Sequence, residues 1–263
     1  MLRVGVFGAG GRMGSTVCRA VASDPDLELV AAVDPRHAGI DLAQLGLPGT
    51  GVHVAANADA LTHAGAAVAV DFTVADAARE NMNWCADHDV HAVVGTTGFT
   101  AGDLAHFASR FRESRANAIV APNFAIGAVL MMRFAELAAP YFETGEIVEL
   151  HHDEKADAPS GTSLLTAERM AAAGKAWGPD PTRKTVVPGA RGALVGDAIR
   201  VHSVRLRGLV AHQEVILGTA GQSLTIRHDS YDRTSFMPGV LLAVKRVADH
   251  PGVTVGLDAL LGL

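Results

Sequence analysis

The sequence predicts an α/β protein made of two domains, one built on a parallel sheet with covering helices and one of α+β type with an open mixed sheet. Two observations support this prediction. Between residues 2 and 120, short apolar runs alternate with helix-like segments, which is typical of parallel strands joined by crossover helices. Between residues 199 and 228, strand-like runs follow one another without helices, which is typical of an antiparallel or mixed sheet.

Composition limits the class of protein. The chain has 263 residues, of which 49% are hydrophobic and 19% are charged, as expected for a globular protein of one or two domains. The formal net charge of −6 argues against a nucleic-acid partner, and no apolar run is long enough to span a membrane. The 12 histidines show no metal-binding motif, so we expect no metal site. Cys18 and Cys85 fall in predicted helices, which favours buried thiols in a reducing cytoplasm.

The first predicted strand, residues 2–7, leads directly into a glycine-rich turn, and a helix is predicted over residues 15–22. The turn itself, residues 8–14, reads GAGGRMG. Glycines in this context allow a tight turn and a close approach of the backbone to a pyrophosphate, which the helix N-terminus then holds. The pattern is not a strict G-x-G-x-x-G, because Met13 occupies the position of the last glycine. The glycines are better described as recurring every third residue.

A second predicted strand, residues 27–33, ends at Asp34, about 20 residues beyond the glycine turn. Strand, turn, helix, strand and acid together predict a Rossmann-type dinucleotide-binding domain. The Asp34 carboxylate would accept hydrogen bonds from ribose hydroxyls and repel a phosphate, which favours NADH. Arg12, Arg36 and His37 lie near it in the sequence, so the use of NADPH stays open. The alternative is that Asp34 is only a turn residue that ends the strand.

The rest of the first half continues the alternation of strands and helices. The pattern predicts a loop over residues 37–51 and a short third strand over residues 51–54. Three further strands are predicted over residues 66–70, 91–94 and 118–120, with helices between them over residues 75–88 and 101–112. They end in the small polar groups 71–73, 95–98 and 121–124. Because ligands bind outside the carboxyl ends of parallel strands, we expect these groups to form a surface for the nicotinamide half of the cofactor.

A chemically dense loop, residues 149–162, reads ELHHDEKADAPSGT. An apolar run over residues 147–150 predicts a strand before it, and residues 163–170 predict a helix after it. Either Ser160 or Thr162 would cap that helix, whose N-terminus would then form an anion site.

Titratable donors lie beside this predicted anion site. His151 and Lys155 are close to it in the sequence, and cations beside an anion cradle favour an acidic substrate and a proton transfer. The alternative is a polar loop that happens to contain histidine and lysine.

The second half of the chain has a different architecture. Residues 126–141 predict a long apolar helix that joins the domains, and residues 174–191 an exposed loop. A strand is predicted over residues 199–206, a hairpin over residues 211–217 and 223–228, and a terminal helix over residues 238–248. We therefore expect a dinucleotide-binding domain over residues 1–125 and 235–263, and a substrate-binding and oligomerisation domain over residues 126–234. An open sheet with one helical face is often covered by another subunit, which favours a homo-oligomer.

These residues resemble the 4-hydroxy-tetrahydrodipicolinate reductases, formerly called dihydrodipicolinate reductases. The resemblance runs through more than half of the chain in the family's order. The matching stretches are residues 8–14, 71–73, 95–98, 121–124 and 149–162. The glycine turn alone is unspecific, whereas the pattern HHxxKxDxPSGT is highly specific.

The resemblance implies an NAD(P)H-dependent reduction of 4-hydroxy-tetrahydrodipicolinate to tetrahydrodipicolinate with loss of water, in diaminopimelate and lysine biosynthesis. In the family's roles, His151 is a proton donor or acceptor and Lys155 a proton donor. The substrate carboxylates would be bound by His152, Gly161 and Thr162. The cofactor would be held by Gly8, Ala9, Gly10, Gly11, Arg12, Met13, Asp34, Gly95, Thr96, Thr97, Ala121, Pro122, Asn123 and Phe124. The family also implies a homotetramer built through sheets of the second domain.

One departure from the family bears on the cofactor. Some members carry an arginine directly after the ribose-binding acid, where it meets the 2′-phosphate of NADPH. Here that position is Pro35, and the first arginine is Arg36. The resemblance therefore implies the use of both NADH and NADPH, with NADH favoured.

Two other functions fit parts of the sequence. A dehydrogenase acting on homoserine or aspartate would share the glycine turn and Asp34, but it does not explain the double-histidine loop. A non-catalytic dinucleotide sensor would need an output surface, such as a basic DNA-binding segment, and none is visible at a net charge of −6.

Overall fold

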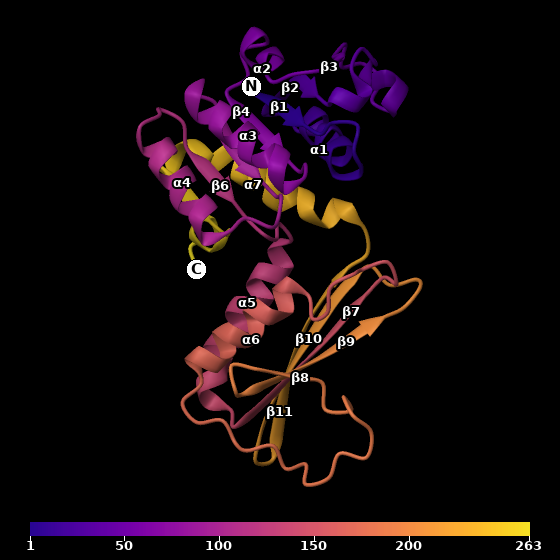
Figure 1. The fold of residues 1–263 in the computed structure, drawn as a ribbon, viewed down its shortest axis with the longest axis vertical. Helices are drawn as coiled ribbons and strands as arrows, with labels where there is room; N and C mark the ends of the chain where they lie inside the picture. Colours follow the sequence, from indigo (N-terminus) through magenta and orange to yellow (C-terminus); the bar gives the residue numbers. More distant parts are fainter. The chain divides into compact units, whose positions relative to one another are not determined.

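The computed structural model describes all of residues 1–263 and divides into two compact units (Figure 1). Unit 1 comprises Met1–Phe124 together with Phe236–Leu263, and unit 2 comprises Ala125–Ser235. No helix in the structure combines the length and the apolar character needed to cross a membrane.

Unit 1 is built on a seven-stranded sheet in which every pair of neighbouring strands is parallel. In spatial order the strands are β12 (Val253–Val255), β6 (Ala118–Val120), β5 (His91–Val94), β4 (Val68–Asp71), β1 (Leu2–Phe7), β2 (Leu27–Val33) and β3 (Val54–Ala55). The predicted parallel-sheet fold class is confirmed. The third strand is shorter than predicted, because residues 51–53 belong to the preceding loop, apart from an isolated bridge between Asp41 and His53.

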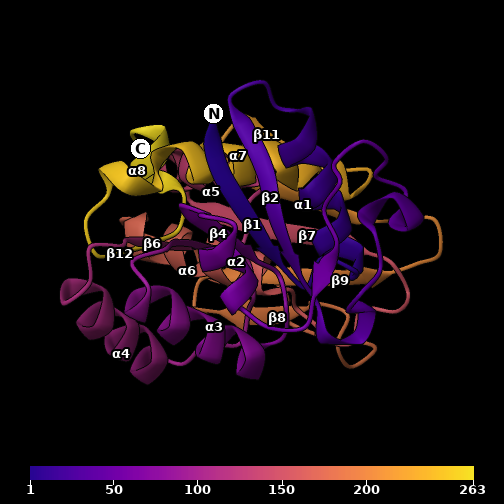
Figure 2. The same cartoon turned by 90° about the horizontal axis from the view of Figure 1, so that it is seen from above.

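Strand order reverses at β1, which fixes where the helices lie. The chain moves from β1 to β2 through α1 (Arg12–Ser23), then crosses to β4 on the other side of β1. Since such crossovers are right-handed, helices on the two branches cover opposite faces. Figure 2 shows α1 and α7 (Met237–Arg246) on one face and α3 (Ala75–Asp87) and α4 (Ala101–Arg112) on the other. The crevice outside the carboxyl ends of β1 and β4 is therefore the expected ligand site of this sheet.

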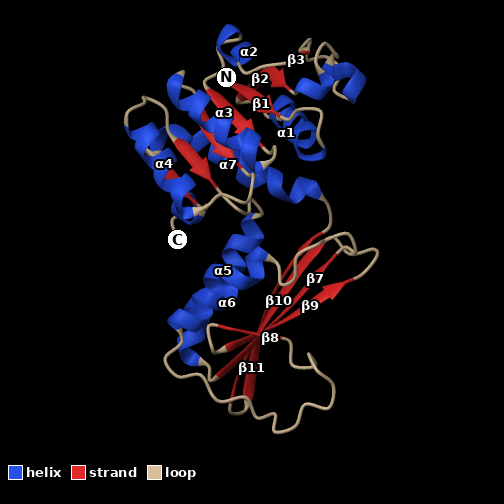
Figure 3. Ribbon diagram, viewed as in Figure 1, coloured by secondary structure: helices blue, strands red, loops and turns tan.

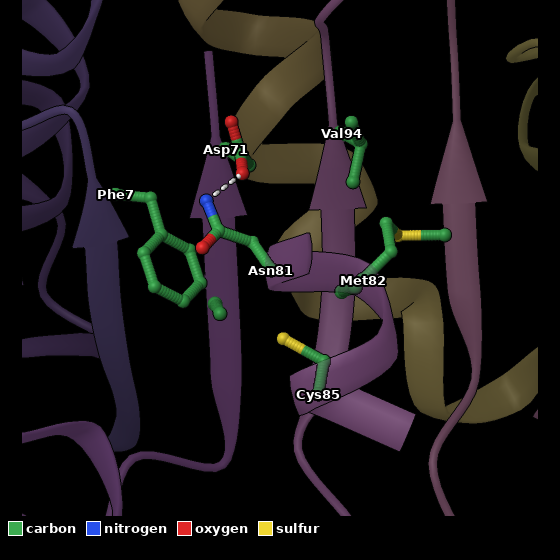
Figure 4. A pocket seen from close by; sticks show the side chains of 8 residues that line it. Phe7, Asp71, Asn81, Met82, Cys85 and Val94 are labelled. Carbon is green, nitrogen blue, oxygen red and sulfur yellow. Dashed lines mark hydrogen bonds between the residues drawn. The ribbon is translucent and has the colours of Figure 1, made fainter. Parts of the chain in front are cut away.

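Apolar side chains hold the helices on the sheet. One core cluster contains Phe7 from β1, Met82 and Cys85 from α3, and Phe107 and Phe111 from α4, all of them almost fully buried. Figure 4 shows part of it, where Asn81 reaches from α3 to Asp71 at the end of β4. The narrow space between these side chains does not admit a water molecule, so it is a feature of core packing.

The thiol of Cys18, in α1, is also buried. Burial raises the pKa of this thiol to about 12, which keeps it protonated.

Unit 2 contains a five-stranded mixed sheet, as predicted. Its spatial order is β11 (Gln222–Ser230), β10 (Ala211–Thr219), β7 (Thr144–His151), β9 (Ile199–Arg205) and β8 (Ala193–Val195). Only β7 and β9 run parallel, and β10 and β11 form the predicted hairpin. Two helices, α5 (Ile126–Ala138) and α6 (Gly161–Ala173), pack on this sheet around Ile147, Ile199 and Val215. Residues 174–192 form an irregular stretch, drawn in tan in Figure 3.

Besides the short 3-10 helices, two α-helices and two strands of the fold were not predicted. They are α2 (Asp59–His63), β8, β12 and α8 (Asp258–Leu261). Each has five residues or fewer, which is too short to show a periodic hydrophobic pattern. Three helices also begin earlier than predicted: α1 at Arg12, α6 at Gly161 and, by one residue, α7 at Met237.

Candidate active site

The glycine turn of unit 1 joins β1 to α1 with the backbone packed unusually close. Gly8 has a φ of +66°, a conformation that glycine adopts without strain. A β-carbon on Gly14 would lie 2.0 Å from the carbonyl oxygen of Gly8, so only glycine lets the helix approach the strand here. The helix begins after Gly11, and no side chain caps it. Arg12 and Met13 therefore lie in its first turn, at the end that attracts anions.

Asp34 connects the end of β2 to this turn. Its Oδ2 accepts a hydrogen bond from the Gly10 N–H at 3.0 Å, and its Oδ1 accepts one from the Arg36 N–H at 3.0 Å. The Nδ1 atom of His37 lies 3.1 Å from the same Oδ2. Asp34 thus ends the strand as a turn residue and also lies beside the glycine turn.

The three polar groups predicted at the strand ends do lie together. Asp71 is almost fully buried and accepts hydrogen bonds from the N–H and hydroxyl of Thr73, both at 2.7 Å. It also accepts one from the Thr96 hydroxyl at 3.3 Å, which joins the loop after β4 to the loop after β5. The ring of Phe72 packs against that of Phe124 with centroids 5.6 Å apart, which brings in the segment after β6.

In unit 2, the predicted catalytic loop connects β7 to α6. His151 is the last residue of β7, and Ser160 is the N-cap of α6, where its hydroxyl accepts a hydrogen bond from the Ser163 N–H at 3.2 Å. The structure thus assigns the cap to Ser160 and places Thr162 inside the helix. Gly161 and Thr162 form the start of the first turn, where N–H groups have no acceptor within the helix.

Lys155 and His152 lie on the loop itself. The Lys155 ammonium donates to both carboxylate oxygens of Asp157, at 2.7 and 2.9 Å. The hydrogen bond from Lys155 lowers the pKa of the Asp157 carboxyl. His152 is exposed, and its backbone N–H donates to the carbonyl of Val210 at 3.4 Å.

Sequence reasoning gave no role to Glu149, the most buried charged group near this loop. Its side chain is completely inaccessible to solvent, and it contacts Nδ1 of His151. The Arg205 guanidinium donates to both of its oxygens, at 2.9 and 2.8 Å. Although desolvation raises the pKa of this carboxyl, hydrogen bonds from His151, Arg205 and Ser203 outweigh it and lower the pKa to about 2.

A signal for Glu149 was present in the sequence. Side chains two residues apart share a face of a strand, so Ile147, Glu149 and His151 point the same way. A glutamate that lies between an apolar residue and a histidine on one buried face of a strand needs a positively charged partner for its carboxylate. Its partner Arg205 lies 56 residues further along the chain, and no local pattern identifies it.

Comparisons with known proteins agree with this arrangement. Sequence models of the dihydrodipicolinate reductase N-terminus and C-terminus match residues 2–124 and 127–261, respectively. The 4-hydroxy-tetrahydrodipicolinate reductases of Cutibacterium acnes and Mycobacterium marinum are each 50% identical to the chain, over 100% of both sequences. The solved structure of dipicolinate-bound dihydrodipicolinate reductase from Paenisporosarcina sp. TG-14 has a TM-score of 0.87 and 41% identity, and the match covers 98% of this chain and 99% of that one.

Proposed function

The chain belongs to the dihydrodipicolinate reductase family, and from this premise we propose that it reduces 4-hydroxy-tetrahydrodipicolinate to tetrahydrodipicolinate with NADH or NADPH in diaminopimelate and lysine biosynthesis. One observation carries the proposal: identity of 50% over the full length of reductases named for this reaction. In the balanced reaction, the substrate gains a hydride, one proton is consumed, and a hydroxyl group leaves as water.

Unit 1 fits a nicotinamide dinucleotide. The close packing of Gly8 and Gly14 brings α1 directly against the end of β1, and Asp34 lies beside this turn through the hydrogen bond that it accepts from Gly10. We assign the pyrophosphate to residues 8–13 and the adenosine ribose to Asp34. The nicotinamide half is assigned to Gly95, Thr96 and Thr97 and to residues 121–124. The bound cofactor supplies the hydride.

Unit 2 supplies groups suited to an acidic substrate. We assign the substrate carboxylates to His152 and to the first turn of α6 at Gly161 and Thr162, where the helix dipole favours anions. Lys155 would donate the proton that leaves with the hydroxyl group as water. His151 would donate or accept a proton at the ring nitrogen that is not bound to Glu149.

The open sheet of unit 2 supports a homotetramer. Helices α5 and α6 pack on one face, and Val148, Leu150 and Ile216 lie half-buried at alternate positions that point to the other. We assign this second face to contacts between subunits. We also assign the chain to the cytoplasm, which agrees with two cysteines that form no disulfide.

The proposal is tested by following NADH and NADPH oxidation with freshly made substrate. The substrate is formed from pyruvate and aspartate semialdehyde by the preceding synthase, and homoserine and aspartate serve as comparison substrates. We expect rapid oxidation only with the cyclic dicarboxylate, and a ratio of kcat/KM values that favours NADH. A folded protein that binds NADH but oxidises neither cofactor, or that prefers homoserine or aspartate, would refute the proposal.

A further inference from the structure

We propose that Glu149 and Arg205 form a positioning pair that holds both His151 and Lys155 in place for proton transfer. This inference deepens the proposed function and rests on it. Neither residue of the pair is assigned to contact the substrate or the cofactor. Their role is to fix the orientation and the proton of the groups that do.

The pair reaches His151 directly. Glu149 and His151 share a face of β7, and Arg205 is the residue opposite His151 on the parallel strand β9. Oε2 of Glu149 contacts Nδ1 of His151 and accepts from Arg205 at 2.9 Å, while Oε1 accepts from Arg205 at 2.8 Å. Because an ionised carboxylate is only an acceptor, Nδ1 must carry a proton. The neutral ring therefore offers Nε2 for proton exchange.

The same pair reaches Lys155 through the loop. One nitrogen of the Arg205 guanidinium donates both to Glu149 and to the backbone carbonyl of Asp157, the latter at 2.6 Å. The Asp157 carboxylate in turn holds the Lys155 ammonium with two hydrogen bonds. Oε1 of Glu149 also accepts from the Ser160 N–H at 3.3 Å, at the cap of α6. One buried carboxylate thus connects the strand, the loop and the helix start.

A purely structural ion pair is the alternative, and β7 offers a matched example of one. Glu146 lies three residues before Glu149 and points to the other face of the sheet. It pairs with Arg191 and accepts from His202 at 2.7 Å, so it has the same three residue types. No residue of that second group lies on the catalytic loop. Glu146→Gln is therefore the control for the loss of a glutamate that bridges an arginine and a histidine.

The first test measures steady-state kinetics of Glu149→Gln. We expect kcat to fall about 100-fold, which is the loss of rate that a misplaced catalytic group typically causes. The KM for NADH should not change, because the residues that we assign to the cofactor lie in unit 1. Glu146→Gln should keep kcat within about threefold of wild type, at the same oligomeric state by light scattering. A Glu149→Gln enzyme that loses no more activity than this control would overturn the proposal.

The pH profile separates positioning from simple loss of stability. Glu149 on the same strand contacts His151, and Arg205 lies opposite it on β9 and shares that carboxylate, whereas its partner on β10 is the uncharged Ala211. Lys155 and Asp157 lie on the loop that follows, connected to Arg205 through the Asp157 carbonyl. Removing the negative charge leaves the cation of Arg205, which disfavours the imidazolium. The pH profile of kcat/KM should therefore differ between Glu149→Gln and wild type, and an unchanged profile would contradict the pair's role.

Two further measurements guard against misfolding and against failure of the proposed function. Arg205→Lys keeps the charge but cannot span the carboxylate and the Asp157 carbonyl, so kcat should fall about tenfold while the pH profile of kcat/KM stays that of wild type. Histidine NMR of the wild-type protein without substrate should show the neutral His151 ring protonated at Nδ1. A wild type with this tautomer and no reductase activity would refute the proposed function alone. The opposite tautomer in an active enzyme would refute the positioning pair alone.

Discussion

At the residue scale, His151 and Lys155 are the two groups that we propose for proton transfer, one at the end of β7 and one on the loop that follows it. Glu149 holds His151 at Nδ1. Asp157 holds the Lys155 ammonium through both of its carboxylate oxygens. We predict that His151→Ala and Lys155→Ala each lower kcat by about 10²–10⁴-fold, the usual cost of a lost proton-transfer group. NADH binding, followed by fluorescence titration, should persist because the residues that we assign to the cofactor lie in unit 1. Full activity in both variants would remove these side chains from the mechanism.

Glu149 also makes a prediction about acid stability. The folded protein keeps this carboxyl ionised down to about pH 2, whereas its ordinary pKa is 4.5. Since the unfolded chain binds one more proton between these pH values, the stability that Glu149 contributes is complete above 4.5 and is lost as pH falls toward 2. The free energy of unfolding should thus fall more steeply in wild type than in Glu149→Gln, by up to about 1.4 kcal/mol per pH unit. Urea unfolding at several pH values measures this difference, and equal slopes would contradict it.

The positions of single residues could be predicted where the determinants are local. Asp34 follows β2 directly and lies beside the glycine turn, as its spacing from that turn predicts, whereas its role toward a ribose stays a prediction. The choice between Ser160 and Thr162 as helix cap depended on where α6 begins, which spacing alone did not decide. The partnership of Glu149 with Arg205 depends on the register of β7 and β9, a property of the folded sheet.

At the scale of elements, the junction of β1 and α1 depends on the absence of a side chain at Gly14. A methyl group there would meet the backbone of Gly8 at 2.0 Å. We predict that Gly14→Ala lowers the free energy of unfolding by about 1–3 kcal/mol, as overpacking does, and weakens NADH binding at least tenfold. Denaturant unfolding and fluorescence titration measure the two effects.

The matched control for Gly14→Ala is Gly102→Ala in α4. Gly102 is exposed, and the nearest atom to an added β-carbon would be the Thr100 hydroxyl at 3.6 Å. Alanine should be accepted there or should stabilise the helix slightly, without an effect on NADH. If both substitutions behaved alike, close packing would not be the reason for the glycine at position 14.

Long elements were predicted more reliably than short ones. The strands of the parallel sheet are continuous apolar runs separated by helices, and the hairpin of unit 2 surrounds a glycine turn, so both have clear sequence patterns. β12 has only three residues, yet it completes one edge of the seven-stranded sheet by pairing with β6. We expected the C-terminal segment to belong to the first domain, but a run of three residues does not show that it forms a strand or which strand it pairs with.

At the scale of the whole molecule, the open face of the unit 2 sheet makes a prediction about assembly. Light scattering should give a mass of about 109 kDa, four times that of the 27.3 kDa chain. A charged residue introduced at Ile216, which lies half-buried at an outward position of β10, should lower this mass. A wild-type protein that scatters as a 27.3 kDa monomer at micromolar concentration would contradict the assigned interface.

The most direct test of the proposed reaction is the transfer of a labelled hydride. NADH carrying deuterium at both C4 positions would be mixed with enzyme and freshly made 4-hydroxy-tetrahydrodipicolinate, and the product analysed by mass spectrometry. We predict tetrahydrodipicolinate that carries one deuterium on its ring, formed in step with the oxidation of NADH. A product without deuterium, or labelled NADH recovered unchanged beside untouched substrate, would contradict hydride transfer to this substrate and with it the proposed function.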